Sequence, residues 1–175
     1  MKKLLLAILL LGFSIYGFTQ DVKYGIRGGY NISNLNFDGN IPMTNKHRNS
    51  IYIGFFGDVR LSKTVSIVPE IQFSAEGARV EVWQLDYIQA PVFLKFRLSE
   101  KIRFGVGPQV GLKVNKVDDG AKNMAYSGVV GVEYKLSHML FADVRYTNGF
   151  VDVFDDNSTI SAKNTNIQLG VGYKF

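Results

Sequence analysis

The chain contains no cysteine, which excludes a disulfide framework, a lipoprotein anchor and any metal site built on thiolates. Proline is rare, with four residues, whereas glycine and aromatic residues are plentiful. This composition is typical of many strands and few helices. A length of 175 residues accommodates one domain and leaves no room for a second large core.

The excess of positive charge is small. The chain has 20 Lys and Arg against 15 Asp and Glu, and setting aside Lys2 and Lys3 leaves 18 against 15. The basic residues recur singly on one side of strands and form neither a run nor a stripe. This distribution argues against a nucleic-acid partner.

The first residues have the pattern of an export signal. A positive start is followed by an apolar run, residues 4–13, that is too short to span a bilayer. We therefore predict a signal peptide over residues 1–19, with cleavage before Gln20. The alternative interpretation is an N-terminal membrane anchor. No other stretch approaches the roughly 20 apolar residues that a membrane helix needs.

A short turn motif recurs along the chain. Copies with Leu-Ser in second and third place begin at Arg60, Arg97 and Lys135, and Lys174 with Phe175 would begin a fourth. The hydrophobic second residues of successive copies lie 37, 38 and 39 residues apart. Each period can hold two strands and one long loop. The spacing therefore predicts eight strands, with short turns at one end and long loops at the other.

Within each predicted strand, odd and even positions differ chemically. In residues 101–114 the even positions are apolar, from Ile102 to Val114, and the odd positions are Lys, Arg, Gln or Gly. The same alternation recurs in residues 24–32, 51–61, 65–74, 88–98, 129–136, 140–147 and 166–175. Most of these segments are close to the ~10 residues that a tilted transmembrane strand requires.

Alternation alone leaves two orientations open. A soluble lipocalin-like barrel that binds a ligand would turn the apolar face inward. Glycines such as Gly105 and Gly107 gather on the polar face, which carries charges of both signs, and aromatics such as Tyr134 and Tyr173 sit at strand ends. These features favour an all-β, eight-stranded antiparallel up-and-down transmembrane β-barrel over residues 20–175. We predict an outer-membrane location, periplasmic turns and extracellular loops.

The polar faces predict a charged lumen. An eight-stranded barrel is just wide enough inside for its own side chains, so a plugged lumen with a structural charge network is expected. The alternative is a narrow channel or a small-solute binder that uses these charges. The predicted network consists of Arg27, Asp58, Arg60, Glu70, Lys95, Arg97, Arg103, Glu133, Lys135, Asp143, Arg145 and Lys174.

The long connections predict where partners bind. They span residues 34–49, 75–85, 115–125 and 148–165. Binding residues concentrate on such loops, so the expected partners are outer-membrane lipid and an envelope or extracellular protein. Asp152, Asp155 and Asp156 in the last loop are weak candidates for a Ca²⁺ site, because the EF-hand spacing and its terminal Glu are missing. A solvated acidic loop is the favoured interpretation.

Motifs for catalysis are missing or incomplete. Gly105, Gly107 and Gly111 resemble a phosphate-binding glycine motif, but the third glycine comes one place late and no helix follows. His47 and His138 are isolated from one another in the sequence, and no Gly-x-Ser-x-Gly elbow occurs. We therefore predict no enzyme, no cofactor and no metal. A barrel enzyme with a site assembled from acidic loop residues is the alternative.

Three segments resemble the PorT-like outer-membrane barrel family. Residues 85–96 (LDYIQAPVFLKF) resemble its "Y-hydrophobic-E/Q-x-P-hydrophobic-x-hydrophobic-K" signature, residues 104–111 (FGVGPQVG) its "aromatic-x-x-G-P-x-x-G" strand, and residues 172–175 (GYKF) its terminus. The resemblance implies an eight-stranded outer-membrane barrel, and it assigns no activity. Gln89 stands where an acidic residue is common in that family, which implies that one inward charge pair is missing.

Overall fold

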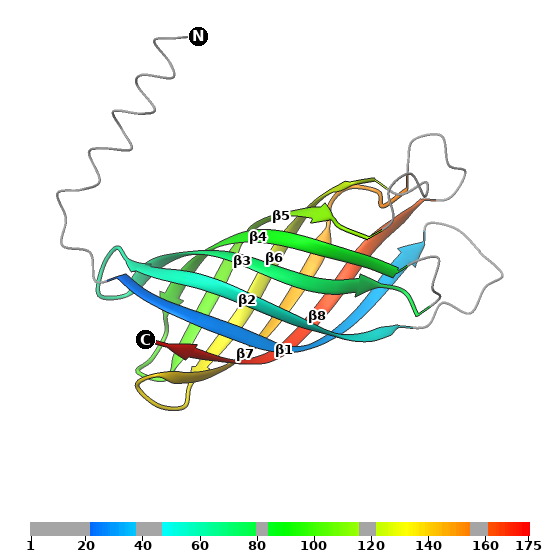
Figure 1. Cartoon of the computed structure of the whole chain (residues 1–175). Helices are drawn as coiled ribbons and strands as arrows, with labels where there is room; N and C mark the ends of the chain where they lie inside the picture. Colours follow the sequence, from blue (N-terminus) through cyan, green and yellow to red (C-terminus); the bar gives the residue numbers. More distant parts are fainter. Residues whose placement is uncertain (1–21, 38–46, 80–83, 116–121, 155–160) are drawn as a thin grey trace, which may run out of the picture.

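Antiparallel strands close into a single barrel (Figure 1). The computed structural model describes residues 22–37, 47–79, 84–115, 122–154 and 161–175. Within these ranges the strands are β1 (Val22–Phe37), β2 (Arg48–Arg60), β3 (Val65–Gly77), β4 (Gln84–Arg97), β5 (Ile102–Lys113), β6 (Met124–Lys135), β7 (Leu140–Gly149) and β8 (Ala162–Lys174). Each strand pairs with its neighbour in sequence, and β8 pairs with β1. The predicted eight-stranded up-and-down barrel is confirmed.

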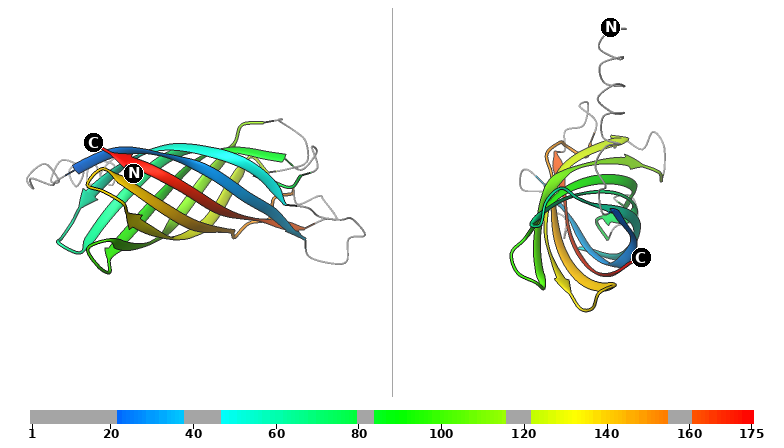
Figure 2. Two further views of the ribbon diagram at one scale, coloured as in Figure 1. Left: turned by 90° about the horizontal axis from the view of Figure 1, so that it is seen from below. Right: turned by 90° about the vertical axis from the view of Figure 1, so that its left-hand side faces the viewer.

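Three short turns lie at one end, which we call the turn end (Figure 2). They correspond to the predicted Leu-Ser repeats. In each turn the serine Oγ accepts hydrogen bonds from the backbone N–H groups two and three residues further on. The six N···Oγ distances, at Ser62, Ser99 and Ser137, lie between 3.0 and 3.3 Å. The serine recurs in the repeat because its side chain accepts hydrogen bonds from the backbone N–H groups of the turn.

The strands run further at the opposite end, the loop end, than the sequence predicts. β3 continues to Gly77 and β8 begins at Ala162, both inside regions predicted as loops. The structure describes no helix that could cross a membrane. The predicted signal peptide, residues 1–19, lies outside the described residues.

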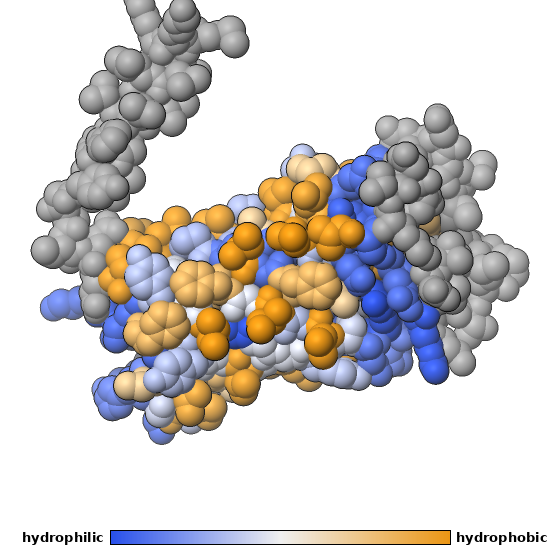
Figure 3. All heavy atoms as spheres, in the orientation of Figure 1, coloured by the Kyte–Doolittle hydropathy of each residue, from blue (hydrophilic) through white to orange (hydrophobic). Residues whose placement is uncertain are grey.

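The apolar residues of each strand lie on the outer surface of the barrel. Phe104, Val110 and Leu169 are 36%, 39% and 42% exposed, whereas the Lys95 side chain is 6% exposed. Figure 3 shows apolar side chains over the middle of the barrel and hydrophilic ones toward the loop end. The predicted orientation, apolar face outward and ionic face inward, is therefore confirmed.

Aromatic side chains gather on one side of this outer surface near the turn end, on β1, β2, β8 and the C-terminal residue. Tyr24 stacks on Phe55 with ring centroids 6.0 Å apart, and Phe175 lies 6.5 Å from Phe55 and 6.4 Å from Tyr173. Amphipathic rings of this kind occupy the boundary between apolar and polar surroundings. These rings mark the edge of the apolar surface that lies nearest the turn end.

Candidate functional site

The right panel of Figure 2 shows the ring of strands from the turn end. The side chains inside this ring are arranged in layers along the barrel. Because side chains alternate across a strand, every second residue points inward. The inward glycines make room for large neighbours. A Cβ on Gly172 would overlap the ring of Phe141, and one on Gly25 would overlap the ring of Phe56. The expectation that small residues fit a crowded lumen is confirmed.

The layer nearest the turn end is ionic. Arg103 binds both carboxylate oxygens of Asp58, with N···O distances of 2.7 and 3.2 Å. Lys95 Nζ and Lys174 Nζ each lie 2.6 Å from one oxygen of Glu133. Three cations therefore share two carboxylates, which leaves this layer one positive charge in excess.

An aromatic layer follows. Phe56, Phe93 and Phe141 are buried together with Val68 and Val129. Phe56 and Phe141 meet edge to face, with centroids 5.7 Å apart. Cations cover these rings: Lys95 Nζ lies between 5.7 and 5.9 Å from all three centroids, and the Arg145 guanidinium carbon lies 4.3 Å from that of Phe93. Such contacts favour a cation that has been removed from water.

Arg27 forms the centre of a third layer. Its Nη1 lies 3.0 Å from Glu70 Oε1, and its Nη2 lies 3.0 Å from Asp143 Oδ2 and 2.6 Å from Tyr52 Oη. Arg145 contacts the same two carboxylates, each at 2.9 Å. Two cations thus balance two buried carboxylates, as a buried charge requires.

Glu76 differs from the other buried carboxylates, because its hydrogen bonds come from neutral side chains. It accepts hydrogen bonds from Ser74 Oγ (2.7 Å), Gln89 Nε2 (2.8 Å), Asn166 Nδ2 (3.0 Å) and Asn164 Nδ2 (2.5 Å). Four directed donors can hold a carboxylate without a cation. This cluster joins β3, β4 and β8 near the loop end.

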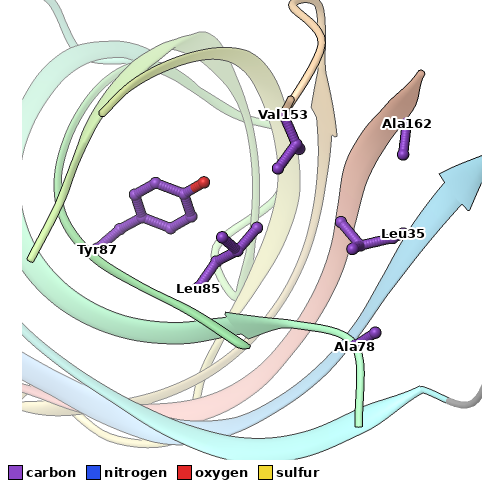
Figure 4. Packing of buried hydrophobic residues seen from close by; sticks show 6 residues of the cluster. All are labelled: Leu35, Ala78, Leu85, Tyr87, Val153 and Ala162. Atoms are coloured by element: carbon purple, nitrogen blue, oxygen red, sulfur yellow. The ribbon is translucent and has the colours of Figure 1, made fainter. Parts of the chain in front are cut away.

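An apolar cluster lies inside the barrel at the loop end (Figure 4). The side chains of Leu35, Leu85 and Val153 converge, and Tyr87 extends into the interior beside them. All four are buried, with Leu35 completely inaccessible. The ionic layer, the aromatic layer, the Arg27 layer, the Glu76 cluster and this apolar cluster thus follow one another along the barrel interior.

The structure brings together nine of the twelve predicted lumen residues in the two ionic layers. Arg60, Arg97 and Lys135 are placed differently: they are exposed at the turn end. There they line a cavity of about 350 Å³.

Several lumen residues were not predicted. Tyr52, Gln72 and Gln168 all bond to Arg27, and their inward parity is the signal that identifies them. Glu76 was missed because its segment was assigned to a loop. Gln89, interpreted as a missing charge, accepts from Gln72 (2.7 Å) and donates to Glu76.

The predicted acidic cluster is only partly described. Asp152 accepts hydrogen bonds from Ser161 and from the Ala162 backbone N–H. Slight burial acts to raise the pKa of Asp152, but these hydrogen bonds outweigh it and hold the pKa below its ordinary value. Asp155 and Asp156 lie outside the described residues. No group of three metal-ligating side chains is found in the parts of the chain that the structure describes.

Comparisons with known proteins agree on the architecture. A family model, outer membrane protein beta-barrel domain, matches residues 5–175. A comparison with curated protein sequences finds no match.

Solved structures show the same fold. The attachment invasion locus protein Ail of Yersinia pestis is 15% identical, with a TM-score of 0.54, over 87% of this chain and 98% of Ail. Neisserial surface protein A is 12% identical, with a TM-score of 0.59, over 87% of this chain and 97% of that protein. A further Ail structure contains the heparin analogue sucrose octasulfate and is 16% identical, with a TM-score of 0.54, over 88% of this chain and 99% of that one.

Proposed function

Because the chain belongs to the outer membrane protein beta-barrel domain family, we propose that it is a non-enzymatic barrel whose loop end faces outward and binds an envelope or extracellular macromolecule. Its apolar band contacts the lipid of the outer membrane. The three motifs in residues 85–96, 104–111 and 172–175 support placement in the PorT-like subfamily, and residues 1–19 would act as the export signal.

The network of buried ion pairs across the barrel is the observation that supports this proposal. Arg27, Glu70 and Asp143 are fully or nearly fully buried and bonded to one another across the barrel. A water-filled path would have to break these contacts and then pass the apolar cluster at the loop end. The two ends of the barrel therefore remain as the surfaces where partners can bind. The Ail structure with sucrose octasulfate shows that a barrel of similar fold can take a ligand.

Planar-bilayer recording tests the closed lumen. We expect the purified barrel to give no conductance steps beyond those of a detergent blank, because ions would have to displace the ion pairs that cross the lumen at Arg27. A porin inserted under the same conditions is the positive control. Reproducible steps of one amplitude would contradict the proposal and favour the channel alternative.

Cysteine labelling tests the orientation, and the absence of native cysteine makes the test clean. Lys163→Cys places a thiol at the loop end and Lys63→Cys places one at the turn end, both at exposed positions. With a membrane-impermeant maleimide, we expect Lys163→Cys to label on intact cells and Lys63→Cys only after permeabilisation. The reverse pattern would place the loop end in the periplasm and refute an outward-facing binding surface.

A further inference from the structure

The cavity at the turn end is strongly cationic. The cavity has a volume of about 350 Å³. The described residues that line it include seven Lys and Arg side chains and His138, but only three carboxylates. A volume in this range is typical of small-molecule sites, which start near 300 Å³. The excess of positive charge therefore surrounds a space that a small ligand could fill.

The carboxylates at the floor of this cavity are already engaged. Asp58 binds Arg103 in a two-point contact and also lies 3.2 Å from Lys174 Nζ. Glu133 is bound by Lys95 and Lys174 at 2.6 Å each. Asp58 and Glu133 are thus already paired with cations of the ionic layer. They contribute little to neutralising the cations nearer the opening of the cavity.

The cations nearer the opening are placed against one another. Arg97 lies directly opposite Arg103 in the β4–β5 pairing, and both point to the inner face by parity. Like charges directly opposite on one face of a sheet repel. Lys135, at the end of β6, lines the same cavity and is exposed, as Arg97 is. An anion between these groups would relieve the repulsion.

We propose that the turn-end cavity binds an oxyanion of the phosphate type, held by Arg97 and Lys135 above the Arg103 layer. Guanidinium groups form paired hydrogen bonds with the oxygens of phosphate, and Lys adds a compact positive charge. The site uses residues at the turn end alone and is separate from the proposed outward-facing surface. Its occupancy in the cell by a periplasmic compound or leaflet lipid rests on the orientation proposed above.

Titration calorimetry with pyrophosphate tests the site, using the full barrel refolded in a zwitterionic detergent at low ionic strength. We expect one saturable site whose affinity decreases as NaCl is added, since salt screens exposed charges. Arg97→Gln combined with Lys135→Gln should weaken binding at least about tenfold, because charge-assisted hydrogen bonds are lost. Both residues are exposed, so the double variant should fold, which circular dichroism melting verifies.

Lys63→Gln is the matched control. Lys63 is an exposed cation in a turn at the same end, but it does not line the cavity. Its replacement should leave pyrophosphate affinity within about twofold of wild type if binding is local. The absence of saturable binding, or an equal loss in Lys63→Gln, would overturn the proposal.

A second arm identifies the source of the phosphate group. Pyrophosphate affinity is measured for the barrel in phosphatidylcholine vesicles with and without phosphatidylglycerol. Competition by phosphatidylglycerol that disappears in the double variant would assign the site to a lipid headgroup. Unchanged affinity would assign it to a soluble compound. Both results support an oxyanion site, whereas competition that persists equally in the double variant would count against it.

Discussion

Replacement of Arg27 by Met should destabilise the barrel by about 3–5 kcal/mol, the cost of removing one partner from a buried ion pair. Met keeps much of the side-chain volume, so the effect reports charge and hydrogen bonding more than a cavity. Glu70 and Asp143 would lose one of their two cations, and Gln72, Gln168 and Tyr52 would lose a partner. Urea unfolding of the refolded barrel in lipid vesicles measures the change in unfolding free energy.

Two further variants make this result specific. Arg79→Met removes an exposed arginine and should change stability by no more than about 0.5 kcal/mol. The double variant Arg27→Met with Asp143→Asn should be less destabilised than the sum of its single variants, with a coupling energy of about 0.5–3 kcal/mol. Strict additivity, or a loss in Arg27→Met no larger than in Arg79→Met, would show that the central layer contributes little.

Replacement of Val106 by Arg should cost about 2–4 kcal/mol, because Val106 lies in the middle of β5 on the outer apolar face and a charge there meets hydrocarbon. Gln109→Arg is the matched substitution on the inner face of the same strand. Gln109 shares a small pocket with Glu76, which is hydrogen-bonded by neutral side chains, so the new cation can approach an acidic group. We expect a smaller loss at this position.

The same urea titration compares the two arginine variants. Refolding yield in vesicles gives a second readout, since a charge on the outer face also opposes insertion. Equal losses at Val106 and Gln109 would mean that the inner and outer faces of β5 do not differ energetically. That outcome would contradict the assignment of the outer face to lipid.

Parity predicted which side chains point inward, because the two faces of a strand alternate without exception along a regular ladder. It could not predict their partners. Arg27 and Asp143 are 116 residues apart, and their contact depends on how all eight strands are staggered around the barrel. The sequence therefore identified members of the ionic layers but not the layers themselves.

Two kinds of residue escaped prediction for different reasons. Phe56, Phe93 and Phe141 share the inward parity of the charged residues on their strands, and only the structure shows that they form a separate layer that contacts cations. Glu76 follows the inward parity of Gln72 and Ser74, but it lies in residues 75–85, which were predicted as a loop, so the alternation was not extended to it. Strand ends are where local composition and tertiary pairing most often disagree.

The pairing of β1 with β8 implies an order of assembly. Every other strand pair joins neighbours in sequence, and three of them are closed by serine-bonded turns that can form locally. The β1–β8 pair brings together residues as far apart as Gly25 and Lys174, 149 positions along the chain, so its closure has the largest entropic cost. Arg27 contributes from β1, and its partners lie on β2, β3, β7 and β8. The ion pairs of Arg27 therefore form completely only when β1 pairs with β8. Once formed, they stabilise the closed cylinder.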